Sequence, residues 1–222
     1  MTGVLHLGLP GASTPAVVEY GFAIEKKGAS DAWVRQVHGR DFRVVDRSDT
    51  ATSKQSAPPA DAVITSTPGL EIHVYTADCL PVLLAGSDDM GNTTIAAIHS
   101  GWRGTMQGIV PAVLAEWKIP LEQTYAVVGP AISGCHFEVK EDFVQEFSAH
   151  APKMQNYLDR ENSKMFFRLA EFVRGEQLRE IPADHYRNEF QICTYCSLPE
   201  LPSYRRNKGT DPQIRAWIRI RA

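Results

Sequence analysis

The chain has 222 residues, of which 43% are hydrophobic and 22% charged, and its formal net charge is -3 at pH 7. Such a chain can bury one good-sized core, and we interpret residues 1–222 as a single domain. A slightly acidic protein has no electrostatic reason to bind nucleic acid or an anionic membrane surface, so we exclude both as main partners.

Targeting and redox signals favour the cytoplasm. No run approaches the roughly 18 apolar residues that cross a bilayer, and residues 1–9 lack the basic and apolar regions of a signal peptide. The four cysteines are too few for a disulfide framework, so we expect reduced thiols.

The first half of the chain favours closely spaced strands. Residues 32–37 and 42–45 predict strands, and the segment 48–59, rich in Ser, Thr, Ala and Pro, predicts a loop. Four further strands, rich in Val, Ile and Leu and separated by turn signals, are expected at residues 61–66, 71–76, 81–85 and 93–98. Together they predict the centre of a mixed sheet.

Helical spacing begins after residue 105. One apolar face is formed by Met106, Ile109, Val110, Val113, Leu114 and Trp117, and Pro111 within it predicts a kink or a late start. A strand is then expected at 125–128, helices at 140–147 and 167–179, and a half-buried strand that closes the sheet at 214–220. The pattern predicts an α/β fold in which helices cover a mixed sheet.

Three short segments set a metal-type or nucleophilic side chain at the end of an apolar run. They are Gln36-Val37-His38-Gly39, Ala77-Asp78-Cys79-Leu80-Pro81 and His99-Ser100-Gly101-Trp102-Arg103-Gly104. The gaps between them are far longer than in a zinc finger, so the side chains can meet only through tertiary folding. If they meet, His38, Cys79 and His99 form either a zinc or copper site with an open position or a cysteine nucleophile with a histidine base. The plainer interpretation is a buried cysteine and two hydrogen-bonded histidines.

Five sequence blocks resemble the YfiH/laccase-domain family. They are Arg35-Gln36-Val37-His38-Gly39, Thr76-Ala77-Asp78-Cys79-Leu80-Pro81-Val82, Ile98-His99-Ser100-Gly101-Trp102-Arg103-Gly104-Thr105, Val128-Gly129-Pro130-Ala131-Ile132 and Ser203-Tyr204-Arg205-Arg206. Their order also matches, and the resemblance runs from about residue 21 to the C-terminus. Members of this family are described as polyphenol oxidases, purine nucleoside enzymes or peptidoglycan editing factors.

The resemblance implies a four-layer α/β/β/α fold with mixed sheets. It also implies a zinc ion held by His38, Cys79 and His99. The implied reactions are phosphorolysis of adenosine, inosine, guanosine or methylthioadenosine, deamination of adenosine, and, in older descriptions, copper-dependent oxidation of phenols. The implied partners are therefore a purine nucleoside and phosphate.

The chain departs from the family pattern on the substrate side. Phe22-Ala23-Ile24-Glu25 places an acidic residue where an arginine is usual, and the stretch between Ser30 and Trp33 is shortened and omits a helix. The usual Asp-Leu is Arg168-Leu169, and the usual Gly-Arg is Asp211-Pro212. The metal-binding triad is intact, whereas the substrate contacts are altered.

Each reaction requires different groups beside the triad. Phosphorolysis needs cations to hold phosphate, and we assign this role to Arg103 and Arg205, with Tyr204 beside them. Deamination needs an activated water and a carboxylate that moves protons, for which Asp78 and Glu138 are candidates.

Other functions are open at this point. The remaining histidines, at positions 6, 73, 136, 150 and 185, are too scattered for the trinuclear cluster of a multicopper laccase. A metal-free hydrolase or amidase can use Cys79 as nucleophile, His99 as base, and His38 or a backbone N–H against the oxyanion. The third possibility is a metal-binding homologue without catalysis.

The other cysteines offer weaker signals. Cys193-Thr194-Tyr195-Cys196 has the spacing of a redox or zinc motif, but no second pair is visible and we assign it a structural role. Cys135, with His136 after the Gly129-Pro130 turn, is expected behind the pocket. The nucleoside, the acceptor, the choice between zinc and copper and the oligomeric state are not fixed by the sequence.

Overall fold

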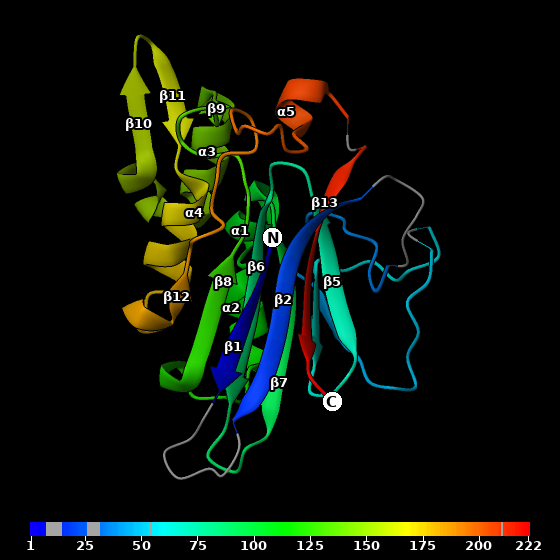
Figure 1. Ribbon diagram of the computed structural model, residues 1–222. Coiled ribbons are helices and arrows are strands. Elements are labelled where there is room, and N and C mark those ends of the chain that lie inside the picture. The colour runs from blue at the N-terminus through cyan, green and yellow to red at the C-terminus, as the bar shows by residue number, and fades with distance from the viewer. Residues whose placement is uncertain (8–14, 26–31, 54, 210) are drawn as a thin grey trace.

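Two β-sheets packed against each other form the centre of the molecule (Figure 1). The computed structural model describes residues 1–7, 15–25, 32–53, 55–209 and 211–222. The first sheet is antiparallel throughout, with strand order β1 (Thr2–Leu7), β2 (Ala16–Glu25), β13 (Gln213–Ile220), β5 (Glu71–Thr76). The strand expected at 214–220 is therefore confirmed, although it lies inside the sheet rather than at its edge.

The second sheet is mixed. Its order is β12 (Tyr186–Arg187), β8 (Thr124–Val128), β6 (Leu80–Ser87), β7 (Thr93–Ser100), β4 (Ala62–Thr65), β3 (Phe42–Val44). The two outer pairs, β12 with β8 and β3 with β4, are parallel, and the inner pairs are antiparallel. A small antiparallel sheet is formed by β10 (Leu158–Glu161), β11 (Lys164–Phe167) and β9 (Glu138–Val139).

Helices cover the face of the six-stranded sheet that points away from the four-stranded sheet. They are α1 (Trp102–Gln107), α2 (Ile109–Glu116), α3 (Glu141–His150) and α4 (Leu169–Phe172), while the short α5 (Tyr204–Asn207) lies near one end of the molecule (Figure 1). Three 3-10 turns (Leu121–Gln123, Pro152–Tyr157, Ala183–His185) and a π-helical turn (Val173–Gln177) complete the helical structure of the described residues. None of the described helices is long and apolar enough to cross a membrane.

The burial of β6 explains its continuous apolar sequence. Leu80, Val82 and Leu84 pack in the core beneath the helices, whereas Leu83 and Ala85 pack between the two sheets. A strand covered on both faces needs apolar residues at every position. By contrast, β13 alternates buried and half-buried residues because only one of its faces meets a core.

The class, α and β structure with few helices, is confirmed, and of the sheets described the six-stranded one is mixed. The described residues form three of the four expected layers: the helices, the six-stranded sheet and the four-stranded sheet. The outer face of the four-stranded sheet carries ion pairs, such as those of Glu19 with Arg219 and Arg221. Ser30, at the start of the shortened stretch, lies outside the described residues.

Three local predictions were wrong in detail. Residues 32–37 form two isolated bridges, Ala32 to Thr52 and Arg35 to Pro59, because their neighbours are loop segments rather than strands. The first helix breaks at Gly108, whose φ of 83° lies in the left-handed region, and α2 starts two residues before Pro111. The segment expected as a helix from residue 167 is a strand to Phe167 and helical only from Leu169.

Candidate metal centre and substrate pocket

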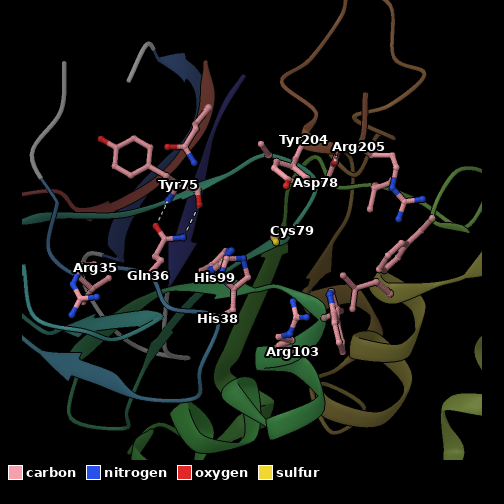
Figure 2. Close-up of a pocket in the computed structure, with 17 residues that line it drawn as sticks. Arg35, Gln36, His38, Tyr75, Asp78, Cys79, His99, Arg103, Tyr204 and Arg205 are labelled. Carbon is pink, nitrogen blue, oxygen red and sulfur yellow. Dashed lines mark hydrogen bonds between the residues drawn. The ribbon is translucent and has the colours of Figure 1, made fainter. Parts of the chain in front are cut away.

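Sheet pairing and one loop bring His38, Cys79 and His99 together. Leu80 pairs with Ser100 and Pro81 with His99, so the start of β6 and the end of β7 place Cys79 beside His99. One nitrogen of each histidine and the sulfur of Cys79 all lie within 4.8 Å of one another. The two imidazole rings are nearly perpendicular, with centroids 4.8 Å apart (Figure 2).

Asp61 holds both histidines, and sequence reasoning missed it. Its carboxylate is fully buried just before β4. Oδ1 lies 2.8 Å from Nδ1 of His99 and accepts a 2.9 Å hydrogen bond from the N–H of His38, and Oδ2 accepts from the N–H groups of Val37 and Gly39 at 3.2 and 2.7 Å. The carboxylate therefore fixes the His99 ring and the loop that carries His38. An acidic residue directly before the apolar run Ala62-Val63-Ile64 was the available signal.

Gln36 ties the same loop to the other sheet. Its amide nitrogen donates to the carbonyl of Tyr75 at 2.7 Å, and its amide oxygen accepts from the N–H of Tyr75 at 2.8 Å (Figure 2). The side chain thus pairs with the edge of β5 as a neighbouring strand would.

The backbone at the site is locally strained and tightly packed. His38 and Asp78 have φ values of 61° and 84°, in the left-handed region that non-glycine residues seldom adopt. Gly101 leaves room for the ligands, because a Cβ there would lie 2.9 Å from Sγ of Cys79 and 3.1 Å from Cδ2 of His38. A glycine is therefore required at this close approach.

The surroundings of Cys79 and His99 favour the charged forms of both side chains. Burial raises the pKa of the Cys79 thiol, but His99 and His38 beside it outweigh this and lower the pKa to about 6. Burial lowers the pKa of His99, but the thiolate and Asp61 outweigh this and raise it to about 9. The site thus stabilises a thiolate, the form of cysteine that binds metals and attacks electrophiles.

A cavity of about 630 Å³ opens onto the three side chains. This volume is within the range of small-molecule sites. Its walls are mainly apolar and aromatic, with Trp102, Phe137, Ile132 and Leu169 on the side of the helices, and Val34, Tyr75 and Ala77 among the other lining residues. Trp102 also packs on Phe143, with ring centroids 5.1 Å apart. It therefore serves both the core and the pocket.

Three arginines line this cavity. Arg103 lies over the Trp102 ring at 4.2 Å, and within the described residues neither Arg103 nor Arg35 has a carboxylate partner. Arg205 is held in place, because its N–H donates to Asp78 and its guanidinium donates to the carbonyl of Glu138 at 3.0 Å. Arg103, Arg205 and the half-exposed Tyr204 all line the cavity, and Arg35 joins them although it was not predicted as a cation of the site.

The expected carboxylates have other partners. Asp78 accepts a 2.6 Å hydrogen bond from Thr194 Oγ1 at Oδ1 and another of 2.6 Å from the N–H of Arg205 at Oδ2. Glu138 forms an ion pair with Lys164 at 3.0 Å and does not line the cavity. The structure likewise places Cys135 away from the cavity, in a separate cluster with Cys193 and Cys196.

The departures from the family pattern lie outside the cavity lining. Glu25 accepts a hydrogen bond from the Tyr75 hydroxyl at 3.3 Å and lies 3.7 Å from Arg215. Arg168 pairs with Asp159 at 3.0 Å and packs on Gly134. Asp211 does not line the cavity, while its neighbour Gln213 does.

Comparison with known proteins identifies the family of the chain. The family model described as multi-copper polyphenol oxidoreductase laccase matches residues 19–221. A purine nucleoside phosphorylase of Aquifex aeolicus is 38% identical over 182 residues, which are 79% of each chain. Purine nucleoside phosphorylase YfiH of Escherichia coli is 30% identical over 93% of this chain and 82% of its own.

Solved structures agree on the fold. Bacillus licheniformis YfiH, described as a hypothetical protein, has a TM-score of 0.76 at 20% identity, over 93% of this chain and 92% of its own. YlmD of Geobacillus stearothermophilus has a TM-score of 0.73 at 24% identity, over 99% and 97%.

Proposed function

This chain belongs to the family of laccase-like polyphenol oxidoreductases, and we propose that within it the protein is a zinc-dependent purine nucleoside phosphorylase. The observation that carries the proposal is a His/Cys/His ligand set at a nucleoside-sized cavity that also presents arginines without acidic partners in the described chain. Relatives named purine nucleoside phosphorylase support the same reaction. The cytoplasm, where thiols stay reduced, is the matching location.

The donor set fits a metal ion. Two imidazole nitrogens and a thiolate are common zinc ligands and leave one position open, and they also suit copper. A zinc ion held by His38, Cys79 and His99 would supply Lewis acidity at this end of the cavity.

The protein side chains would divide the remaining work. Arg103 and Arg35 hold the phosphate dianion, since forked guanidinium groups match its oxygens. The apolar wall that contains Trp102 and Phe137 excludes water and holds the purine. An oxygen of hydrogen phosphate forms a bond to the anomeric carbon as the glycosidic bond breaks, and the purine leaves with the electron pair and takes up the proton that the phosphate gives up.

Deamination is less well supported by this cavity. It requires a carboxylate that is free to move protons at the reacting carbon. Asp78 is the acidic residue of the lining, and both of its oxygens already accept hydrogen bonds. We therefore assign phosphate, rather than water, as the acceptor.

A cysteine hydrolase is the second candidate, because Asp61, His99 and Cys79 line up as the members of a catalytic triad. Nδ1 of His99 faces the buried Asp61 at 2.8 Å, and the other side of the ring faces the Cys79 thiolate. A free thiolate oriented in this way can attack a carbonyl carbon. Metal bound at the same sulfur would exclude this reaction.

The test combines metal analysis with product chromatography. Protein purified without chelators is incubated with adenosine or inosine, with and without phosphate, beside the Cys79→Ser variant. We expect bound zinc, and release of adenine or hypoxanthine with ribose 1-phosphate that requires both phosphate and Cys79. Unchanged nucleosides with metal-loaded protein would refute phosphorolysis, and inosine formed from adenosine without phosphate would show deamination instead. Oxidation of a phenol with copper, or no turnover of any of these substrates, would identify the oxidase or the non-catalytic homologue instead.

A further inference from the structure

A second cluster of metal-type side chains lies outside the cavity. It consists of Cys135 and His136, after β8, and Cys193 and Cys196, after β12, and we call it the Cys₃His cluster. The ligand atoms all lie within 4.8 Å of one another. Sulfur atoms of Cys135 and Cys196 are 4.0 Å apart, and Nδ1 of His136 lies 3.1 Å from Sγ of Cys135 and 3.9 Å from Sγ of Cys193.

These distances match a tetrahedral site better than a disulfide. With zinc–sulfur bonds of about 2.3 Å, ligand sulfurs at tetrahedral corners lie about 3.8 Å apart. A disulfide requires about 2.05 Å, roughly half of the separation seen between Cys135 and Cys196. Three thiolates and one imidazole also form one of the common ligand sets of closed, structural zinc sites.

The surroundings hold the ligands in place. The backbone N–H groups of Ser133, Tyr195 and Cys196 lie near the sulfur of Cys193 and favour its thiolate form. The His136 ring stacks on Tyr195, with centroids 4.5 Å apart and planes 23° from parallel. Metal sites in proteins are supported by such contacts, in which amide groups surround a ligating thiolate and stacking fixes the orientation of a ligating ring.

We propose that Cys135, His136, Cys193 and Cys196 bind a second, structural zinc ion. Each thiol that binds gives up its proton to solvent, and no redox change is involved. The proposal does not depend on the reaction at the cavity, because it concerns different residues.

The position of the Cys₃His cluster links it to the wall of the cavity. The two segments that carry it are joined by a bridge between Ala131 and Cys193, and the N–H of Thr194 donates to the carbonyl of Ala131 at 3.1 Å. Thr194, between the two cysteines, donates to Asp78, next to Cys79. A metal here would clamp the segment that supplies Ile132 and Phe137 to the cavity wall onto the segment that carries Thr194.

Arg206 continues this connection. Its guanidinium donates to the carbonyls of Thr194 and Tyr195 at 3.3 and 2.7 Å, and it follows Tyr204 and Arg205 of the cavity lining. Loss of the second metal should therefore loosen the wall formed by α5 while leaving the His38, Cys79 and His99 ligands in place.

Metal stoichiometry of single variants tests the proposal. Full-length protein and variants are purified under reducing conditions without chelators and analysed for zinc per chain. We expect two zinc ions in the wild type, one in Cys79→Ser and one in Cys193→Ser. Cys196→His, which keeps four ligands, should retain two, as should the control Leu198→Ser, a 91% exposed residue of the same loop.

Cobalt substitution gives a second readout. Cobalt bound by the Cys79→Ser variant should show charge-transfer absorption from three thiolates, whereas that of Cys193→Ser should correspond to the single thiolate of Cys79. The proposal would be overturned if the wild-type protein held one metal ion per chain and Cys193→Ser held the same number. It would also be overturned by a disulfide among Cys135, Cys193 and Cys196, seen as a mass 2 Da below the reduced chain, in protein purified with zinc present throughout, since sulfurs joined in a disulfide do not bind the ion as thiolates. If Cys193→Ser does not fold, the stoichiometry of Cys79→Ser and its cobalt spectrum still decide the question.

Discussion

Replacing Asp61 by asparagine should disable the first metal centre without changing any ligand. An amide can accept through one atom and must donate through the other. If the NH₂ group of the asparagine takes the position of Oδ2, two N–H donors, of Val37 and Gly39, point at a group that cannot accept from them. If the NH₂ group takes the position of Oδ1 instead, it donates a hydrogen bond to Nδ1 of His99. The ring proton of His99 must then lie on its other nitrogen, on the metal side.

The magnitude follows from these two outcomes. Leaving two buried donors unsatisfied costs about 1–3 kcal/mol each. Loss of the carboxylate that orients a ligating histidine lowers metal affinity about 10–100-fold, or about 1.4–2.7 kcal/mol. We therefore expect Asp61→Asn to fold with reduced stability and to bind zinc at least tenfold more weakly.

Competition with a zinc chelator measures the affinity, and urea unfolding measures the stability. The Cys₃His cluster contributes its own zinc, so the measurement is made in the Cys193→Ser background. Asp41→Asn is the matched control, because it removes the same charge from an exposed position of the neighbouring loop. Affinity within twofold of the parent protein would show that Asp61 does not orient His99.

Three further predictions concern the same centre and its cavity. Gly101→Ala should weaken zinc binding at least tenfold because its Cβ would crowd the Cys79 sulfur. Gly209→Ala should not, because the nearest atom to its Cβ would be the carbonyl oxygen of Asn207 at 4.0 Å. Equal affinity of the two variants by chelator competition would contradict this prediction. Arg103→Gln should raise the KM for phosphate about 10–100-fold, since a charge-assisted hydrogen bond contributes about 1.5–3 kcal/mol, while Lys118→Gln, 77% exposed, leaves the KM unchanged. In chelator-treated protein, the rate of Cys79 alkylation can be followed by peptide mass spectrometry. The rate should stay high from pH 9 down to about pH 6 and fall below it, because the lowered pKa of Cys79 keeps the thiolate form in that range. A midpoint near pH 9 would show that the histidines do not stabilise the thiolate.

The sequence predicted the parts of the site that depend on residue type at strand ends. Apolar runs located β6 and β7, and the antiparallel pairing of the two then brings Cys79 to His99. The strand at the C-terminus was visible from its strict alternation. These features are local or follow from one pairing, so their pattern is readable along the chain.

Features set by distant contacts were not readable in the same way. Asp61 acts through a loop more than twenty residues away, and its four hydrogen bonds leave no spacing signal. Cys135 and Cys196 meet across 61 residues, so the second half of the cluster was invisible beside the CxxC motif. Residues 32–37 have a strand-like composition, but only their tertiary neighbours decide that they form isolated bridges.

The central place of β13 sets the order in which the protein can be built. It lies between β2 and β5, and its pairing with β2 joins Ile220 to Val18 across nearly the whole chain. During synthesis, the inner edges of β2 and β5 therefore stay exposed until residues 213–220 have left the ribosome, whereas the strands of the six-stranded sheet are available earlier. Such long-range pairing is slow, and the waiting edges are where a nascent chain would aggregate or need a chaperone.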